Sequence, residues 1–368
     1  MKCRSLLVSA CLIVLFATSA DAAENSAANV IDHYGLEQAD TAVKERKGWR
    51  KPKRILLGGF AARSGTALQS AAPDVELLVA GTPEAKAKIA SVDAIIGFCD
   101  ADVIAAGKAI QWIQLTTAGV ENCVSIPAVK QRNLLVTNMQ RISGPIIAEH
   151  VMALTLAFTR GLDLYIPAQA QGKWARGAAP PGRASVVAGK TMLVVGLGGI
   201  GTEVAKRAHA LGMKVTATRA SGRTGPEFVS YVGLPDELPK LASEADFVVN
   251  TAPLTAQTQG IFNAALFEKM KPTAYLINIA RGGSVVTSDL VEALKSKKIA
   301  GAGLDVTDPE PLPPDHPLWK APNVIITPHV ASDSDLGLDA QLQVVRENLR
   351  RYIAGDRMLS VVDVAKGY

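Results

Sequence analysis

Short apolar runs alternate with segments of helical spacing along most of the chain from Arg54 onward. In the first half these runs are too short to form helices and are separated by polar segments, so they predict strands. The predicted strands are residues 55–57, 76–79, 94–97, 113–116 and 135–137. Because strands that alternate with helices form parallel sheets, we expect a parallel α/β layer of flavodoxin-like size.

A second series of apolar runs predicts strands near residues 192, 214, 246, 275, 302 and 324. Between the two series, residues 146–165 predict a long helix that is apolar on nearly every face and is broken at Pro167. Such a helix must be buried, so we expect it to cross between domains or to lie in a subunit interface. After Pro328, apolar residues recur at helical spacing from Leu338 to Ile353. This pattern predicts an amphipathic helix that packs back on the first domain.

The run at residues 192–195 leads into a G-x-G-x-x-G pattern at Gly196, Gly198 and Gly201, which is followed by a helical segment. Strand, glycine turn and helix in this order build a dinucleotide site. The first glycine allows the tight turn, the second lets a pyrophosphate approach the backbone, and the third lets the helix pack on the strand. The pyrophosphate then lies at the helix N-terminus. The competing interpretation is a glycine-rich surface turn, which the flanking strand and helix disfavour.

The end of the next strand is where an acidic residue usually binds the adenosine ribose. Arg219 takes this place, with Ser221 and Arg223 close behind. A carboxylate would repel a 2′-phosphate, whereas an arginine pairs with it bidentately. We therefore expect NADP as the preferred cofactor and NAD as the alternative; an ordinary solvated arginine is the competing interpretation of Arg219.

These patterns predict an α/β fold with two domains, in which a Rossmann-type dinucleotide-binding domain is inserted into a flavodoxin-like substrate domain. We place the substrate domain at residues 54–145 and 330–368, and the NAD(P)-binding domain at residues 146–329. Residues 23–53 are polar and weakly patterned, and we expect a tail or arm there.

The N-terminal residues 1–22 have the layout of a secretory signal peptide. Lys2 and Arg4 precede an apolar run that is short for a membrane span, and Ala20-Asp21-Ala22 offers a cleavage site. We therefore expect an exported, periplasmic protein with no stable membrane insertion after cleavage. A cytoplasmic protein is the alternative, since a soluble nicotinamide cofactor is usually an intracellular reagent.

Composition excludes several other classes of protein. A chain of 368 residues with 48% hydrophobic content is long enough for two domains with separate cores. The net charge of +5 is mild and aromatic residues make up only 5%, so we expect no nucleic-acid partner. The basic stretch from Lys44 to Arg54 indicates a solvated linker. No cysteine or histidine spacing suggests a metal site.

Three polar residues follow the later predicted strands, where ligands bind in open α/β sheets: Arg281, Glu310 and His329. Reduction of a 2-keto acid needs a cation for the carboxylate, a proton source for the carbonyl oxygen, and a hydride. The planar fork of arginine matches a carboxylate, and histidine has a pKa near neutrality that suits proton transfer. A loop arginine, an exposed loop acid and a turn histidine are the corresponding structural interpretations.

At these motifs the sequence resembles the D-isomer-specific 2-hydroxyacid dehydrogenases, particularly their glyoxylate/hydroxypyruvate reductase branch. The resemblance covers roughly residues 54–360 and rests on four motifs in the family's order, at residues 196–201, 278–283, 304–310 and 327–329. It implies that Arg281 binds substrate, that Glu310 supports His329, and that His329 is the acid/base. Asp305 would then hold the nicotinamide carboxamide.

The resemblance also implies binding roles for two loops. Residues 251–255 match the family's cofactor-lining loop, and residues 116–120 match its substrate loop, whose N–H groups at Ala118, Gly119 and Val120 would grip the substrate carboxylate. The remaining residues expected to line the cofactor are Leu197, Gly199, Ile200, Thr251, Ala252, Pro253 and Ala280. Arg219 and the expected signal peptide depart from the family pattern. We expect a homodimer that acts on a small 2-keto or 2-hydroxy acid.

Cleavage near Ala22 would leave only Cys99 and Cys123, each after a predicted strand of the first domain. In an oxidising periplasm they could form a disulfide that pins the substrate loop, provided that their Cα atoms lie within roughly 7 Å. The favoured interpretation is two unpaired cysteines packed as small hydrophobes.

Two other functions remain open at this point. One is a formate- or phosphite-type dehydrogenase on the same scaffold, although the formate enzymes that resemble this family carry glutamine at the position of His329. The other is a binding module that senses the dinucleotide and signals through a partner.

Overall fold

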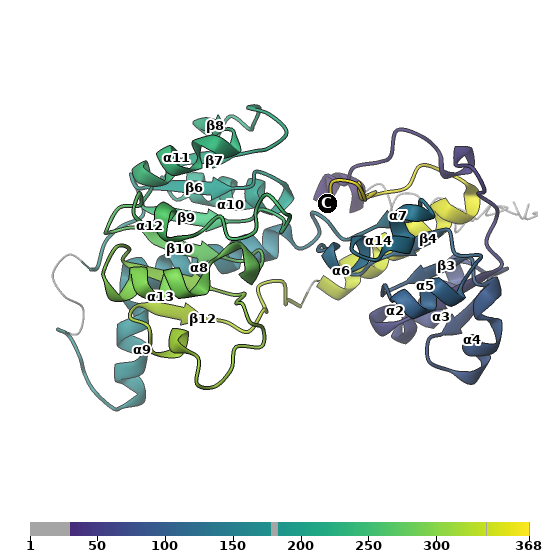
Figure 1. Cartoon of the computed structure of the whole chain (residues 1–368), viewed down its shortest axis with the longest axis horizontal. Helices are drawn as coiled ribbons and strands as arrows, with labels where there is room; N and C mark the ends of the chain where they lie inside the picture. The colour runs from purple at the N-terminus through teal and green to yellow at the C-terminus, as the bar shows by residue number, and fades with distance from the viewer. Residues whose placement is uncertain (1–29, 178–182, 336, 368) are drawn as a thin grey trace, which may run out of the picture.

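The chain forms two α/β units that lie side by side (Figure 1). The computed structural model describes residues 30–177, 183–335 and 337–367. The expected signal peptide at residues 1–22 lies outside these residues. Within the described part of the chain, no helix is both long and apolar enough to cross a membrane. Each unit is built on one sheet in which every strand pairing is parallel, and this confirms the predicted two-domain α/β fold.

The first unit holds a five-stranded sheet in the order β2-β1-β3-β4-β5. Its strands are β1 (Arg54–Leu57), β2 (Glu76–Val79), β3 (Ala94–Ile96), β4 (Trp112–Gln114) and β5 (Leu135–Thr137). Alternate residues of β1 enter separate cores, Ile55 and Leu57 on one face and Leu56 on the other. Burial on both faces explains why these strands appear in the sequence as continuous apolar runs. The connecting helices are α2 (Gly59–Arg63), α3 (Gly65–Ala71), α4 (Pro83–Lys88), α5 (Ala101–Ala106), α6 (Glu121–Val124) and α7 (Pro127–Gln131), with 3-10 turns at Val43–Glu45 and Ile89–Ser91.

The second unit holds a seven-stranded sheet in the order β12-β11-β10-β9-β6-β7-β8. Its strands are β6 (Thr191–Val195), β7 (Lys214–Thr218), β8 (Tyr231–Gly233), β9 (Phe247–Asn250), β10 (Tyr275–Asn278), β11 (Gly301–Leu304) and β12 (Val324–Ile326). The chain builds outward from β6 in both directions, so the strand order reverses between β6 and β9, where open α/β sheets bind ligands. The sequence pattern missed β8, a three-residue edge strand. The helices are α10 (Gly199–Ala210), α11 (Leu238–Glu244), α12 (Ala264–Phe267) and α13 (Thr287–Lys295), with 3-10 turns at Pro235–Glu237, Gly282–Ser284 and Pro317–Lys320.

The long apolar helix ends earlier than predicted. Helix α8 (Gly144–Arg160) stops at Gly161, which has φ +67° and caps the helix in the left-handed conformation. Pro167 therefore does not break this helix but lies inside the next one, α9 (Leu162–Ala170). The buried face of α8 contributes Ile147 and Val151 to the core of the second unit, beside β6 and α10.

The described part of the expected tail packs on the first unit and is not a free tail. Val30, Leu36 and Val43 belong to the same core cluster as β1, and the C-terminal helix α14 (Gly337–Ala354) adds Val345 and Leu349 to it. The return of α14 to the first unit is visible in Figure 1 as the yellow helix among the blue ones. Single apolar residues spread over short helical turns and loops carry no periodic signal, so the sequence pattern could not show this packing.

The two cysteines of the first unit are bridged, so the favoured prediction of unpaired thiols is wrong. Cys99 and Cys123 form a disulfide with a Cα–Cα separation of 5.4 Å. Cys99 follows β3 and Cys123 lies in α6, directly after the expected substrate loop. Neighbouring parallel strands bring both thiols to one edge of the sheet, so the bond ties α6 to the end of β3.

Candidate active site

The glycine loop at residues 196–201 leaves its backbone open at one point. Gly196 has φ +96°, and a Cβ there would lie 2.7 Å from backbone atoms of Ala252. A Cβ on Gly201 would lie 2.3 Å from the carbonyl oxygen of Gly196. At Gly198, in contrast, no atom lies within 4 Å of the Cβ position. The outer glycines therefore let the turn close, and the middle one faces space that a pyrophosphate can enter.

Helix α10 begins at this opening. Its N-cap is Gly198, which has no side chain to cap the first N–H groups, so those of Gly199 and Ile200 are available to an anion. The Thr251 hydroxyl donates to the carbonyl oxygen of Gly196 at 2.6 Å and fixes the loop. Leu197 is buried and supports the loop from below. This cradle suits the pyrophosphate of a dinucleotide.

Two buried asparagines at the ends of β9 and β10 shape the neighbouring loops. The Asn250 amide donates to Oδ1 of Asn278 at 3.0 Å. Asn250 Oδ1 also accepts from the backbone N–H of Ala252 at 3.2 Å. Asn278 Oδ1 accepts from that of Ala280 at the same distance of 3.2 Å. The pair holds both expected cofactor-lining loops, including Pro253, at the same edge of the sheet. Sequence reasoning missed Asn250; the available signal was an amide residue at the end of two adjacent apolar strands.

The ribose position at the end of β7 is occupied by Arg219, as the sequence places it. Its guanidinium donates to the carbonyl oxygen of Thr224 at 3.1 Å, and no carboxylate among the described residues pairs with it. Ser221 lies exposed in the following turn. Arg223, in contrast, pairs with Glu237 at 2.6 Å. The Tyr231 hydroxyl, the Leu234 N–H and this arginine lower the pKa of Glu237 to about 2. Arg219 is thus the more available cation for a 2′-phosphate.

The three expected catalytic residues follow three adjacent strands. Arg281 follows β10, Glu310 follows β11 and His329 follows β12, so all three leave the same edge of the sheet. Glu310 Oε1 lies 2.5 Å from His329 Nδ1. A carboxylate bound to Nδ1 fixes the imidazole tautomer and leaves Nε2 for a ligand. No described residue bonds His329 Nε2. The folded chain therefore brings together Glu310 and His329, the two side chains that the sequence analysis expected to meet.

The Asp305 side chain makes hydrogen bonds within the protein that the resemblance did not indicate. It is only 2% exposed, and its carboxylate accepts hydrogen bonds from the Thr327 hydroxyl at 2.6 Å and from the backbone N–H groups of Val330 and Ala331, each at 3.0 Å. These bonds enclose His329, whose φ of +57° is unusual for a side chain of this size. The buried carboxylate therefore holds the histidine loop in its strained conformation.

The expected substrate loop, which belongs to the first unit, contacts Arg281 of the second unit. Arg281 Nη2 lies 3.1 Å from Glu121 Oε2, and a Cβ on Gly119 would lie 1.6 Å from the same nitrogen. The Asn138 amide donates to the carbonyl oxygen of Ala118 at 2.7 Å, and Val120 is buried at the start of α6. Glu121 and Asn138 were missed by sequence reasoning, since nothing in a local pattern shows that an acid faces Arg281.

Similarity to known proteins agrees with this geometry. Residues 152–331 match the family model described as the NAD-binding domain of D-isomer-specific 2-hydroxyacid dehydrogenases. The chain is 34% identical to a glyoxylate reductase from Thermofilum pendens over 265 residues, 72% of this chain and 78% of that protein. It is 33% identical to human glyoxylate reductase/hydroxypyruvate reductase over 260 residues, 70% of this chain and 78% of that protein.

A solved structure extends this likeness to the fold. The NADPH-dependent glyoxylate/hydroxypyruvate reductase from Sinorhizobium meliloti, solved in complex with NADP and sulfate, superposes with a TM-score of 0.74 at 28% identity, covering 86% of this chain and all of that one. The order of the motifs, the two parallel sheets and these similarities together show that the chain belongs to the NAD(P)-dependent D-isomer-specific 2-hydroxyacid dehydrogenases.

Proposed function

We propose that this enzyme reduces a small 2-keto acid, of the glyoxylate or hydroxypyruvate kind, to the D-2-hydroxy acid, with NADPH as the preferred reductant. The observation that carries the proposal is the Glu310–His329 pair at 2.5 Å, which faces the same sheet edge as Arg281 and the glycine loop. The names of the related glyoxylate and hydroxypyruvate reductases support the substrate class.

Each residue has a distinct role in this proposal. The Arg281 guanidinium and the N–H groups of residues 118–120 bind the substrate carboxylate, because a planar fork and a set of backbone donors match its two oxygens. His329 Nε2 donates the proton to the carbonyl oxygen, while Glu310 orients the ring and stabilises its charged form. Asp305 positions this histidine through its loop, and its contact with the nicotinamide carboxamide stays part of the proposal. The reduced nicotinamide supplies the hydride.

The cofactor would lie along the edge formed by the glycine loop, residues 251–253 and Ala280. Arg219, assisted by Ser221, would bind the 2′-phosphate of NADPH. The absence of an acid at this position and the lack of a carboxylate partner for Arg219 among the described residues support the preference. The NADP complex of the related S. meliloti enzyme is in accord with it.

A turnover screen tests the proposal. Glyoxylate, hydroxypyruvate, pyruvate and bulkier keto acids are each assayed with NADPH and NADH, and the hydroxy acid product is resolved by chirality. His329→Ala should lower kcat by about 10²–10⁴-fold, the usual contribution of general acid catalysis, while NADPH binding stays near that of the unmodified enzyme. His316→Ala, a histidine in the loop before β12, is the matched control. A near-normal kcat for His329→Ala would refute the mechanism.

We further infer that the enzyme is a homodimer. The arm that begins with α9 projects away from the second unit in Figure 1 and exposes Leu162, Ile166 and Trp174, the last with 96% of its surface accessible. Large apolar side chains gathered on one projecting arm are typical of a subunit interface. Light scattering coupled to size exclusion should give twice the mass of the chain, and Trp174→Ser/Ile166→Ser should lower it.

Export to the periplasm also stays a proposal. The Cys99–Cys123 disulfide supports it, since such bonds persist in oxidising compartments. Cell fractionation followed by N-terminal sequencing should find a mature chain that begins near Ala23 in the periplasm. A cytoplasmic protein that retains Met1 would refute it.

A further inference from the structure

A cavity lies at the end of the seven-stranded sheet where its strands begin, opposite to the end at which Arg281, Glu310 and His329 lie. It has a volume of about 480 Å³ and is lined by residues at the beginning of the strands, including Phe247 of β9, Tyr275 of β10, and Ala300 and Asn323, which precede β11 and β12. The catalytic residues follow the other ends of these strands. None of the lining residues belongs to the proposed catalytic or cofactor-binding set.

The rim of this cavity carries unpaired positive charge. Lys190, Lys295 and Lys297 line it, and none of them has a carboxylate within 4 Å among the described residues. Asp246, the one acid among the described residues that line the cavity, is already paired with Lys271 at 3.0 Å and accepts from the backbone N–H of Thr191. Three ammonium groups around one cavity produce a positive potential that attracts anions.

The wall of the cavity holds a buried cation that is bonded within the protein. The Arg183 side chain is only 9% exposed and pairs with Asp163. Its Nη1 donates to the Tyr275 hydroxyl at 2.7 Å, and its guanidinium lies 5.4 Å from the Tyr275 ring centroid. Its Nε has no partner among the described residues. Asp163 Oδ1, the other unpartnered atom of this ion pair, is buried as Nε is, so neither atom is open to a ligand, and the wall is a polar surface formed by Arg183 and Tyr275.

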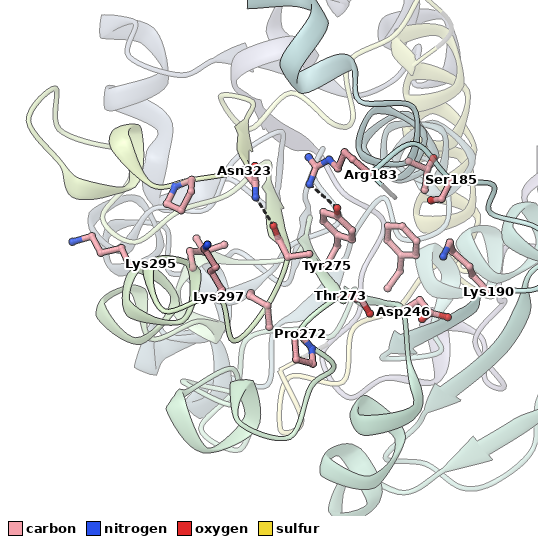
Figure 2. Close-up of a pocket in the computed structure, with 16 residues that line it drawn as sticks. Arg183, Ser185, Lys190, Asp246, Pro272, Thr273, Tyr275, Lys295, Lys297 and Asn323 are labelled. Carbon is pink, nitrogen blue, oxygen red and sulfur yellow. Dashed lines mark hydrogen bonds between the residues drawn. The ribbon is translucent and has the colours of Figure 1, made fainter. Parts of the chain in front are cut away.

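Figure 2 shows how these groups are arranged: Arg183 and Lys190 lie on one side of Tyr275, and Lys295 and Lys297 lie on the other. The last two are at the C-terminal end of α13, where cations are common, so their position alone would not indicate a ligand. Lys297, however, has φ +59°, a conformation in which glycine or asparagine is usual. Lysine is therefore an unusual residue at position 297, where its ammonium group adds positive charge to the rim of the cavity.

We propose that this cavity binds a small multivalent anion of the phosphate or polycarboxylate class. The rim lysines neutralise its charge, and the Tyr275 hydroxyl, which accepts from Arg183, donates a hydrogen bond at the wall. The site is separate from the proposed keto-acid reductase activity, and its ligand is not the substrate of that reaction.

Calorimetric titration of the full, NADP-saturated protein tests this site, because bound NADP fills the other anion-binding cradle. Inorganic pyrophosphate and citrate are the two probes, and the tighter one identifies the class of anion. Lys295→Gln/Lys297→Gln should raise the Kd of that probe about tenfold, as expected for two partly exposed ion pairs. Lys240→Gln/Lys269→Gln, which removes the same charge from exposed lysines outside the cavity, should change it less than twofold.

Lys190→Gln, on the opposite side of the cavity, is a second and independent variant and should raise the Kd of the probe severalfold. Thermal unfolding verifies that each variant is folded. The proposal is overturned if neither probe binds the unmodified protein, or if the rim variants bind as tightly as it does. Because the readout is binding and not turnover, failure here is distinguishable from failure of the reductase proposal.

Discussion

Replacement of Gly119 by alanine should disable substrate binding without removing any functional group. The added methyl group would lie 1.6 Å from Arg281 Nη2 and 2.8 Å from Glu121 Oε2. Non-bonded heavy atoms settle about 3.5–4 Å apart, so the guanidinium must move by about 2 Å. Gly119 has no positive φ, so the alanine backbone itself is unstrained. The perturbation therefore acts on the position of Arg281.

The size of the effect follows from this displacement. A misplacement of about 1 Å of a positioning group can cost about 10²-fold in rate, and loss of a charge-assisted hydrogen bond costs about 1.5–3 kcal/mol. We expect kcat/KM for the best keto acid to fall by about 10²-fold, mostly through a higher KM. The Kd for NADPH should stay unchanged because the glycine loop is not touched.

Steady-state kinetics over a range of keto-acid concentrations, together with NADPH fluorescence titration and thermal unfolding, measure these quantities. Gly65→Ala is the matched control, since a Cβ at Gly65 meets no atom within 4 Å. If Gly119→Ala keeps kcat/KM within twofold of the unmodified enzyme while folded, then Arg281 does not bind the substrate carboxylate from the position seen here.

Three further predictions concern the cofactor, the disulfide and acid stability. Arg219→Asp should reverse the preference for NADPH over NADH, measured as the ratio of the kcat/KM values for the two cofactors. Equal kcat/KM values for both cofactors in the unmodified enzyme would show that Arg219 does not bind the 2′-phosphate. Cys99→Ser/Cys123→Ser should lower the free energy of unfolding by about 3 kcal/mol, the value expected from the chain-entropy model for a loop of 24 residues. The double variant should also raise KM because α6 is released, and an unchanged denaturation midpoint would contradict the stability prediction. Burial raises the pKa of Glu347, but hydrogen bonds from Arg350 and Arg351 outweigh it and lower the pKa below its ordinary value of 4.5. The carboxylate thus stabilises the fold above a pH of about 4.5 and loses this contribution as the pH falls through its lowered pKa. The difference in the free energy of unfolding between the unmodified protein and Glu347→Gln should therefore shrink on acidification, and a difference that is constant with pH would refute this role of Glu347.

Local chemistry in the sequence was enough to predict much of this protein. Strands buried on both faces must be apolar throughout, so the residues of β1, β6 and β10 are recognisable as strands from their side chains alone. Positive φ at Gly196 and close backbone approach at Gly196 and Gly201 admit only glycine, so these two residues indicate the cofactor loop. Residues that follow adjacent parallel strands lie at one end of the sheet, which is why Arg281, Glu310 and His329 could be expected together; that Glu310 supports His329 was implied by the resemblance to the family.

Other features depend on contacts between distant parts of the chain. Glu121 meets Arg281 across 160 residues, and the pairing of Cys99 with Cys123 depends on which strands are neighbours in the sheet. Asp305 carries a motif position, yet only the path of the loop after β12 shows that its carboxylate is used to hold that loop. The sequence by itself determined which residues form the elements and which chemistry they carry, because propensity, periodicity and glycine sterics are local. Only the tertiary structure decided which side chains meet, because the free energy of those contacts depends on how distant segments pack, both within each unit and between the two units.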